Sequence, residues 1–209
     1  YWFDYDGGIS GEVIQDILCV ANKIKLGDFC FVTVGGLSPG AMDNCGSSGE
    51  RLDWLKENMG DVAGDVAIED MEPILFPSVI HKMLISGFKN AFAPRREGSF
   101  VPLLQVKYTD SMPMVTVGGG FLASGTAQQM RAQVDASMPF LETTTSRLYN
   151  IRSLHVTERE RALFDRAVTA PKKRCTERNT LKNLGFSGSD LDAYKELIRY
   201  LPRYVETIV

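Results

Sequence analysis

Two carboxylates follow an apolar stretch near the start of the chain, in the run Asp4-Tyr5-Asp6-Gly7-Gly8. Side chains two residues apart on a strand point to the same side, so Asp4 and Asp6 are predicted to face one cleft. Two carboxylates this close push their pKa values apart, which suits acid–base catalysis or the binding of a cation. The glycines let a ligand approach the backbone closely. The structural alternative is that one aspartate caps the following helix while the other is solvated.

The residues around this motif predict a parallel βαβ unit. Residues 1–6 are rich in aromatic side chains and predict a strand, and residues 12–25 repeat apolar side chains with the period of a helix. Residues 28–34 form a short apolar run, which is typical of a strand covered on both faces. Ligands of open α/β sheets bind at the carboxyl ends of the strands. Thr33 and Gly35, at the end of the second strand, are therefore predicted substrate-binding residues.

Two further strands are predicted downstream. A short helix near 50–59 and a longer helix over 77–92 precede strands at 102–108 and 114–117, which are separated by a turn. These strands predict an antiparallel hairpin, and a mostly parallel sheet that ends in a hairpin is a mixed α/β architecture. The glycines 118–120 lack the Gly-Lys-Ser/Thr ending of a phosphate-binding loop, so we interpret them as part of the hairpin strand, with a bulge.

The rest of the chain, from Thr126 onward, has a helical pattern. Thr157 with Glu160 has the spacing of a capping box, and Ser189 with Asp192 has the same spacing ahead of the last helix. Both pairs predict the start of a helix.

Charge divides the chain into two parts. Residues 1–146 carry 10 Lys+Arg against 18 Asp+Glu, and residues 147–209 carry 13 against 8, so their net charges are −8 and +5. We predict an α/β domain over 1–146 and a small helical C-terminal appendage over 147–209. A basic appendage can contact an anion, a nucleic acid or the acidic part of the same chain, although such charges more often form a solvated face.

Composition excludes several classes of protein. The 209 residues are 44% apolar and 23% charged, which is typical of a globular protein and not of a disordered or fibrous one. The sequence contains no apolar run of the roughly 18 residues that a membrane span needs. The four cysteines lack Cys-x-x-Cys spacing and indicate reduced thiols in a cytoplasmic protein. His81 is predicted to be a buried helix residue, and no third His or Cys joins it and His155, so no metal site is expected.

Two classes of enzyme place such a pair of aspartates at a strand end. In haloacid-dehalogenase-like phosphatases an Asp-x-Asp-Gly motif supplies a nucleophile and an acid–base residue, and Thr33 would supply the phosphate-binding hydroxyl. Those enzymes also need a lysine and further magnesium-binding acids on later strand ends, and Lys82 and Lys89 lie in the middle of a helix. The other class is the S-adenosylmethionine-dependent methyltransferases. A non-catalytic methyltransferase-like scaffold subunit is a third alternative.

The order of the elements resembles that of the methyltransferase sheet, in which five parallel strands are followed by an antiparallel hairpin. Short motifs resemble the bacterial putative O-methyltransferase family, namely Trp2-Phe3-Asp4-Tyr5-Asp6, Phe31-Val32-Thr33-Val34, Met114-Val115-Thr116-Val117-Gly118-Gly119, and Tyr200-Leu201-Pro202 near the end of the chain. The resemblance implies a Rossmann-like methyltransferase domain with a helical C-terminal extension.

The resemblance also implies a division of roles. Asp4 or Asp6 would be the catalytic base or hold the donor's amine, while Asp4, Tyr5 and Gly7 would contact the cofactor S-adenosylmethionine. The glycine-rich cofactor loop would lie upstream of Tyr1, so we expect upstream polypeptide to complete the sheet. The methyl acceptor and the oligomeric state, a homo-oligomer included, are left open.

Overall fold

The computed structural model of the chain describes residues 1–38, 46–109, 112–137, 141, 143–144, 147–151, 156–169 and 176–198. They fall into two compact units, Tyr1–Ile151 and Arg152–Val209, each described below by itself. The division lies a few residues beyond the boundary that the sequence predicts at 146. Several residues named above lie outside the described ones: His155, the cysteines 45 and 175, and the segment 199–209.

The first unit is built on a mixed sheet. Its strands, in the order β1-β2-β4-β3-β5 across the sheet, are β1 (Trp2–Gly8), β2 (Phe29–Gly35), β4 (Pro113–Leu122), β3 (Ser99–Thr109) and β5 (Tyr149–Ile151). β1 pairs with β2 in parallel, whereas β4 is antiparallel to both β2 and β3. The predicted parallel unit and the predicted hairpin are therefore confirmed. β5 is parallel to β3 and falls within the stretch expected to be helical, because three residues are too few to show a period.

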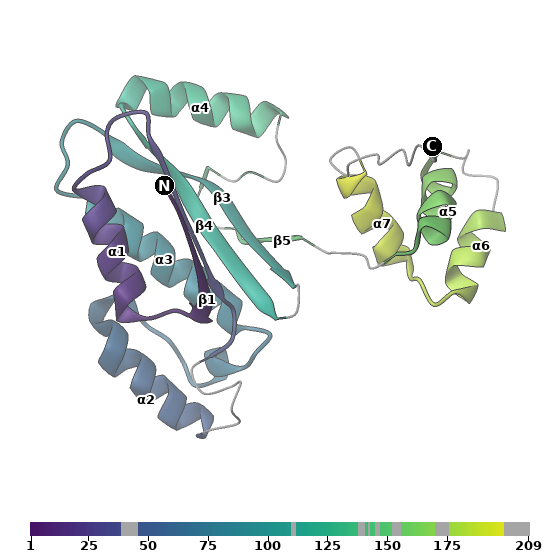
Figure 1. Ribbon diagram of the computed structural model, residues 1–209, viewed down its shortest axis with the longest axis horizontal. Coiled ribbons are helices and arrows are strands. Elements are labelled where there is room, and N and C mark those ends of the chain that lie inside the picture. Colours follow the sequence, from purple (N-terminus) through teal and green to yellow (C-terminus); the bar gives the residue numbers. More distant parts are fainter. Residues whose placement is uncertain are drawn as a thin grey trace, which may run out of the picture. The chain divides into compact units, whose positions relative to one another are not determined.

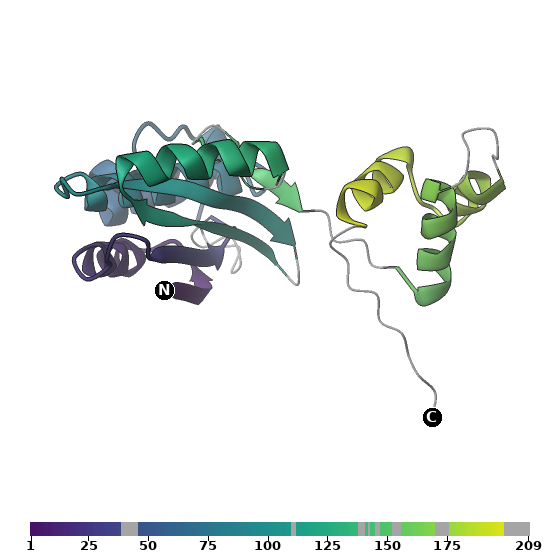
Figure 2. The same ribbon diagram turned by 90° about the horizontal axis from the view of Figure 1, so that it is seen from above.

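Helices cover both faces of this sheet (Figure 1). α1 (Gly11–Ala21), α2 (Ser48–Met59) and α3 (Phe76–Phe92) pack on one face, where their apolar side chains form one core with Val32, Val34, Val115 and Val117. α4 (Ser124–Ser137) packs on Phe29, Val101 and Leu122 of the other face, at the end of the sheet where β2 and β3 begin (Figure 2). The strand ends opposite α4 are therefore the carboxyl ends of β1, β2 and β3.

The glycines of β4 allow three strands to lie unusually close together. A Cβ added to Gly119 would lie 2.0 Å from the carbonyl oxygen of Val101, and one added to Gly118 would lie 2.5 Å from that of Cys30. The ladder between β3 and β4 shifts between Pro102 and Leu104, directly opposite these glycines. The bulge is thus in β3, opposite the glycines, and its predicted place within the glycine strand is wrong.

The second unit is helical. It contains α5 (Glu158–Thr169), α6 (Thr176–Asn183) and α7 (Gly188–Leu197), whose buried side chains include Phe164, Leu181, Leu191 and Tyr194. The predicted capping box of Thr157 and Glu160 is confirmed. The predicted cap at Ser189 and Asp192 is wrong, because Ser187 and Asp190 form the box and the helix begins two residues earlier. α6 was not predicted, since its eight residues bury a single leucine.

Candidate functional site

The carboxyl ends of four strands meet at one edge of the sheet. β1, β2, β3 and β5 all run in one direction, because β4 is antiparallel to the two strands beside it. Gly8, Gly35, Thr109 and Ile151 therefore lie along the same edge, away from α4 (Figure 1). Open α/β sheets bind their ligands at this edge, which makes it the place to look for a site.

Asp4 and Asp6 lie on one face of β1, and both are exposed. Asp4 is the register partner of Thr33 in β2, so its carboxylate is on the face of the sheet opposite α1 and α3. The pairing with β2 becomes irregular between Asp4 and Gly8, at the position of Asp6. The exposed Asp4 and Asp6 alternate with the more buried Phe3 and Tyr5, so both carboxylates lie on one solvent-exposed face of the strand, and the cleft that the sequence predicts between them stays a prediction.

Tyr5 points to the other face of β1. Its hydroxyl donates to Oδ2 of Asp16 in α1 at 2.5 Å, and its ring stacks on Phe3 with the centroids 6.3 Å apart. Burial, together with this carboxylate, raises the pKa of Tyr5 far above its usual value, so the phenol remains protonated. Tyr5 holds α1 against the sheet and does not share a surface with Asp4 and Asp6.

Thr33 is buried beneath an exposed indole. Its side chain is 1% exposed, and its hydroxyl accepts from Nε1 of Trp2 at 3.1 Å and shares a hydrogen bond with Oγ1 of Thr116 at 2.9 Å. Trp2 is 66% exposed and tilts against Phe31, with 5.8 Å between the ring centroids. A substrate that contacts Thr33 would have to displace the indole. Trp2 was not singled out as a site residue, because an aromatic residue in a strand is ordinary.

The two predicted site glycines have different surroundings. A Cβ on Gly7 would have no atom within 4 Å, so this position is open to a ligand. A Cβ on Gly35 would lie 2.7 Å from Cε of Met112 and 3.2 Å from the carbonyl oxygen of Gly7. Gly35 thus allows β1 and β2 to approach each other at their carboxyl ends.

Arg51 was missed by the sequence analysis. From α2, it donates to the carbonyl oxygen of Gly46 at 3.0 and 3.3 Å and to Oγ of Ser38 at 3.4 Å. It therefore holds together the two residues that flank segment 39–45, which follows β2. These contacts join α2 to the carboxyl edge and give Arg51 a positioning role there.

A pocket opens at the same edge, between the start of α3 and the strands β3 and β5. Its volume is about 250 Å³, and its lining includes Pro73, Ile74, Pro77, Lys107, Thr109 and Asn150. Lys107 lies in the strand predicted over 102–108, and nothing in its local sequence points to a binding site. The pocket could not be found from the sequence, because its walls come from segments that are far apart along the chain.

His81 and Arg95 have structural roles. His81 is buried in α3, with Nε2 hydrogen-bonded to Oε1 of Gln105 at 2.6 Å, as expected of a helix histidine. Arg95 donates to the carbonyl oxygens of Ala21 and Ile24 after α1, and its guanidinium lies 4.4 Å from the centroid of the Phe121 ring. Arg95 therefore secures the end of α1 and is not free for a ligand.

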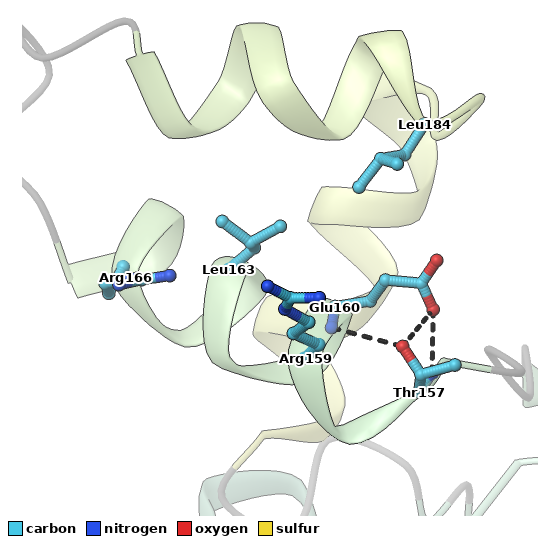
Figure 3. Close-up of a pocket in the computed structure, with 6 residues that line it drawn as sticks. All are labelled: Thr157, Arg159, Glu160, Leu163, Arg166 and Leu184. Carbon is cyan, nitrogen blue, oxygen red and sulfur yellow. Dashed lines mark hydrogen bonds between the residues drawn. The ribbon is translucent and has the colours of Figure 1, made fainter.

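The helical unit has its own hollow, of about 350 Å³ (Figure 3). Arg159, Leu163 and Arg166 line it from α5, with Leu184 across from them. Glu160 also lines it, but its carboxylate accepts from the backbone N–H and the hydroxyl of Thr157, and the backbone bond is the main cause of its lowered pKa. The charged groups of this hollow are therefore mainly cationic.

Metal clusters and membrane-spanning helices are both absent from the described part of the chain. No group of three or more His, Cys, Asp or Glu residues there is arranged to hold a metal ion. None of the helices in the same residues has the length and apolar character needed to cross a membrane.

Comparison with known proteins gives one family. The model of a family described as putative O-methyltransferases matches residues 1–209. The chain therefore belongs to the putative O-methyltransferase family. The search of curated proteins gave no match, nor did the search of solved structures.

Proposed function

We propose that this member of the putative O-methyltransferase family forms the acceptor side of an S-adenosylmethionine-dependent methyltransferase with a Rossmann-like sheet. The observation that carries the proposal is the placement of Asp4 and Asp6 on one exposed face, at the carboxyl half of a parallel strand. The order of a parallel pair followed by an antiparallel hairpin agrees with it.

Methyl transfer to an oxygen requires two things of the protein, a base and the correct alignment of the acceptor. S-adenosylmethionine, when bound, supplies a methyl group on a positively charged sulfur. A carboxylate oxygen of Asp4 or Asp6 would take the proton of the acceptor hydroxyl whose oxygen receives that methyl group. The protein must also align the oxygen with the methyl group.

The residues present fit the cationic part of this donor. Two exposed carboxylates attract a sulfonium or an ammonium group, and Gly7 leaves open space beside them. The donor's amine and the acceptor's proton are therefore the two groups that Asp4 and Asp6 would serve.

The remaining part of the cofactor site would come from another segment. Among the described residues β1 pairs with β2 alone, so the backbone N–H and C=O groups on the other long side of β1 are free to pair with a further strand. We propose that this further strand comes from polypeptide encoded upstream of Tyr1, which would also carry the glycine-rich cofactor loop.

The test is binding of S-adenosylhomocysteine to this chain joined to the polypeptide encoded ahead of Tyr1. We expect the ligand to raise the melting temperature. Asp4→Asn and Asp6→Asn should separate the two roles. The variant that loses the base should methylate on the order of 100-fold more slowly and still bind S-adenosylhomocysteine. The variant that loses the contact to the donor's amine should bind S-adenosylhomocysteine more weakly. Asp53→Asn, an exposed aspartate of α2, is the control.

Three outcomes would overturn the proposal. The first is failure of the joined protein to bind S-adenosylhomocysteine. The second is magnesium-dependent release of phosphate that Asp4→Asn abolishes, which would show a phosphatase. The third is a protein that binds neither ligand but co-purifies with a partner, which would show a scaffold subunit.

A further inference from the structure

The pocket between α3 and the strands β3 and β5 has the chemistry of a binding site. Lys107 of β3 and Asn150 of β5 are register partners in a parallel pair, so their side chains lie next to each other on the same face of the sheet. Lys107 also pairs with Val115, whose side chain is part of the core beneath α3, so both point toward the start of that helix. The pocket therefore has one polar wall made by two adjacent side chains.

The ammonium of Lys107 has no counter-charge. Lys107 is half-buried, and no ion pair or hydrogen bond joins it to any residue that the structure describes. An ammonium carries three hydrogen-bond donors, and a partly buried charge without a partner is unfavourable. An anion in the pocket would satisfy those donors, with the amide of Asn150 and the hydroxyl of Thr109 beside them.

The opposite wall is apolar and stiff. Pro73 and Pro77 have fixed backbone φ angles, and Ile74 between them is 78% exposed although it lines the pocket. A stiff apolar wall loses little entropy when a ligand binds against it. It would cover the hydrocarbon part of a molecule whose charged end reaches Lys107.

We propose that this pocket binds the carboxylate of a small organic acid at Lys107 and Asn150, with the acid's apolar body against Pro73, Ile74 and Pro77. A carboxylate fits better than a phosphate, because the pocket offers a single cation, Lys107, whereas a phosphate group carries about −1.5 to −2 charges at pH 7.

The pocket is separate from the pair of aspartates. Lys107 lies on the face of the sheet that α3 covers, whereas Asp4 and Asp6 lie on the opposite face. β1 and β3 are also separated by β2 and β4, which puts about 14 Å between them. An acid bound at Lys107 is therefore not placed to react at Asp4 or Asp6, and the pocket is a second binding site of the same unit.

The experiment uses saturation-transfer NMR on the full chain, with 3-phenylpropanoate as the probe and its neutral amide as the matched ligand. We expect the acid to bind and the amide to bind on the order of tenfold more weakly, as loss of a charged hydrogen bond predicts. Lys107→Met should weaken binding of the acid by a similar factor, whereas Lys107→Arg retains it. Lys82→Met, an exposed lysine of α3, is the control. The melting temperature of each variant shows that it is folded.

The outcomes are distinct from those of the methyltransferase test, because no cofactor is added. Equal binding of acid and amide, or binding of the acid that Lys107→Met leaves unchanged, would overturn the inference. Displacement of the acid by an equal concentration of inorganic phosphate would overturn the preference for a carboxylate. Binding of the acid without binding of S-adenosylhomocysteine would support the proposed pocket and contradict the proposed methyltransferase function.

Discussion

The direction of a side chain at the site could be predicted only where the local period of the strand determines it. The two-residue period of a strand places Asp4 and Asp6 on one face, and the structure agrees. The surroundings of Thr33 depend on Thr116, 83 positions away, and no local pattern indicates such a partner. The same limit applies to Lys107, whose pocket is completed by segments far apart in the sequence. Long-range contacts therefore decide which of the candidate residues are accessible.

His81 predicts a pH dependence of stability. Burial of the ring lowers the pKa of His81 below its usual 6.5, and Lys82 adds to this, although the bond to Gln105 acts in the opposite direction. The unfolded chain therefore binds a proton at higher pH than the folded chain does. The free energy of unfolding is highest above about pH 6.5 and falls as the pH drops through the lowered value.

His81→Leu should remove this pH dependence and cost about 1–3 kcal/mol at pH 7.5, because a buried hydrogen bond is lost. Urea unfolding at pH 7.5 and 5.5 measures both effects. His155→Gln, which changes the only other histidine, is the control and should keep the slope of the natural chain. Parallel stability curves for the natural chain and His81→Leu would contradict the prediction.

Elements with a clear apolar pattern could be predicted from the sequence. α1 and α3 repeat apolar side chains with the period of a helix, β2 is a continuous apolar run, and all three are present. β5 and α6 have too few buried residues for a period to be visible. The start of α7 was misplaced by two residues because Ser187 and Ser189 each precede an aspartate at the capping distance. Two capping signals two residues apart thus leave the start of a helix ambiguous by that distance.

The glycines of β4 predict a sharp effect on the sheet. Gly119→Ala would place a methyl group against the backbone of Val101 and Pro102, which cannot rotate away as a side chain would. We expect a loss of about 3 kcal/mol or more, measured by urea unfolding. Gly125→Ala is the matched control, since its added Cβ would meet no atom within 4 Å and alanine favours the helix α4. A Gly119→Ala protein as stable as the control would show that β3 and β4 are further apart than described.

At the scale of the whole chain, separate cores account for the two units. The α/β unit has a core on each face of its sheet, the helical unit has a core of its own, and these cores have no residue in common. The charge difference along the sequence agrees with this organisation, since the acidic part contains β1 to β4 of the sheet and the basic part contains α5, α6 and α7. Each core should therefore respond to substitutions within its own unit.

Phe164→Ala tests this expectation. Phe164 is fully buried, with its ring centroid 5.0 Å from that of Phe186 and 4.9 Å from that of Tyr194. Its truncation should cost about 3–5 kcal/mol, which is a large part of the stability of a unit this small. Hydrogen exchange should then show loss of amide protection in α5, α6 and α7, with protection in α1 and α3 unchanged. Leu184→Ala removes an exposed leucine of the same unit and should leave protection intact throughout. Loss of protection in α1 and α3 as well would show that the two cores unfold as one.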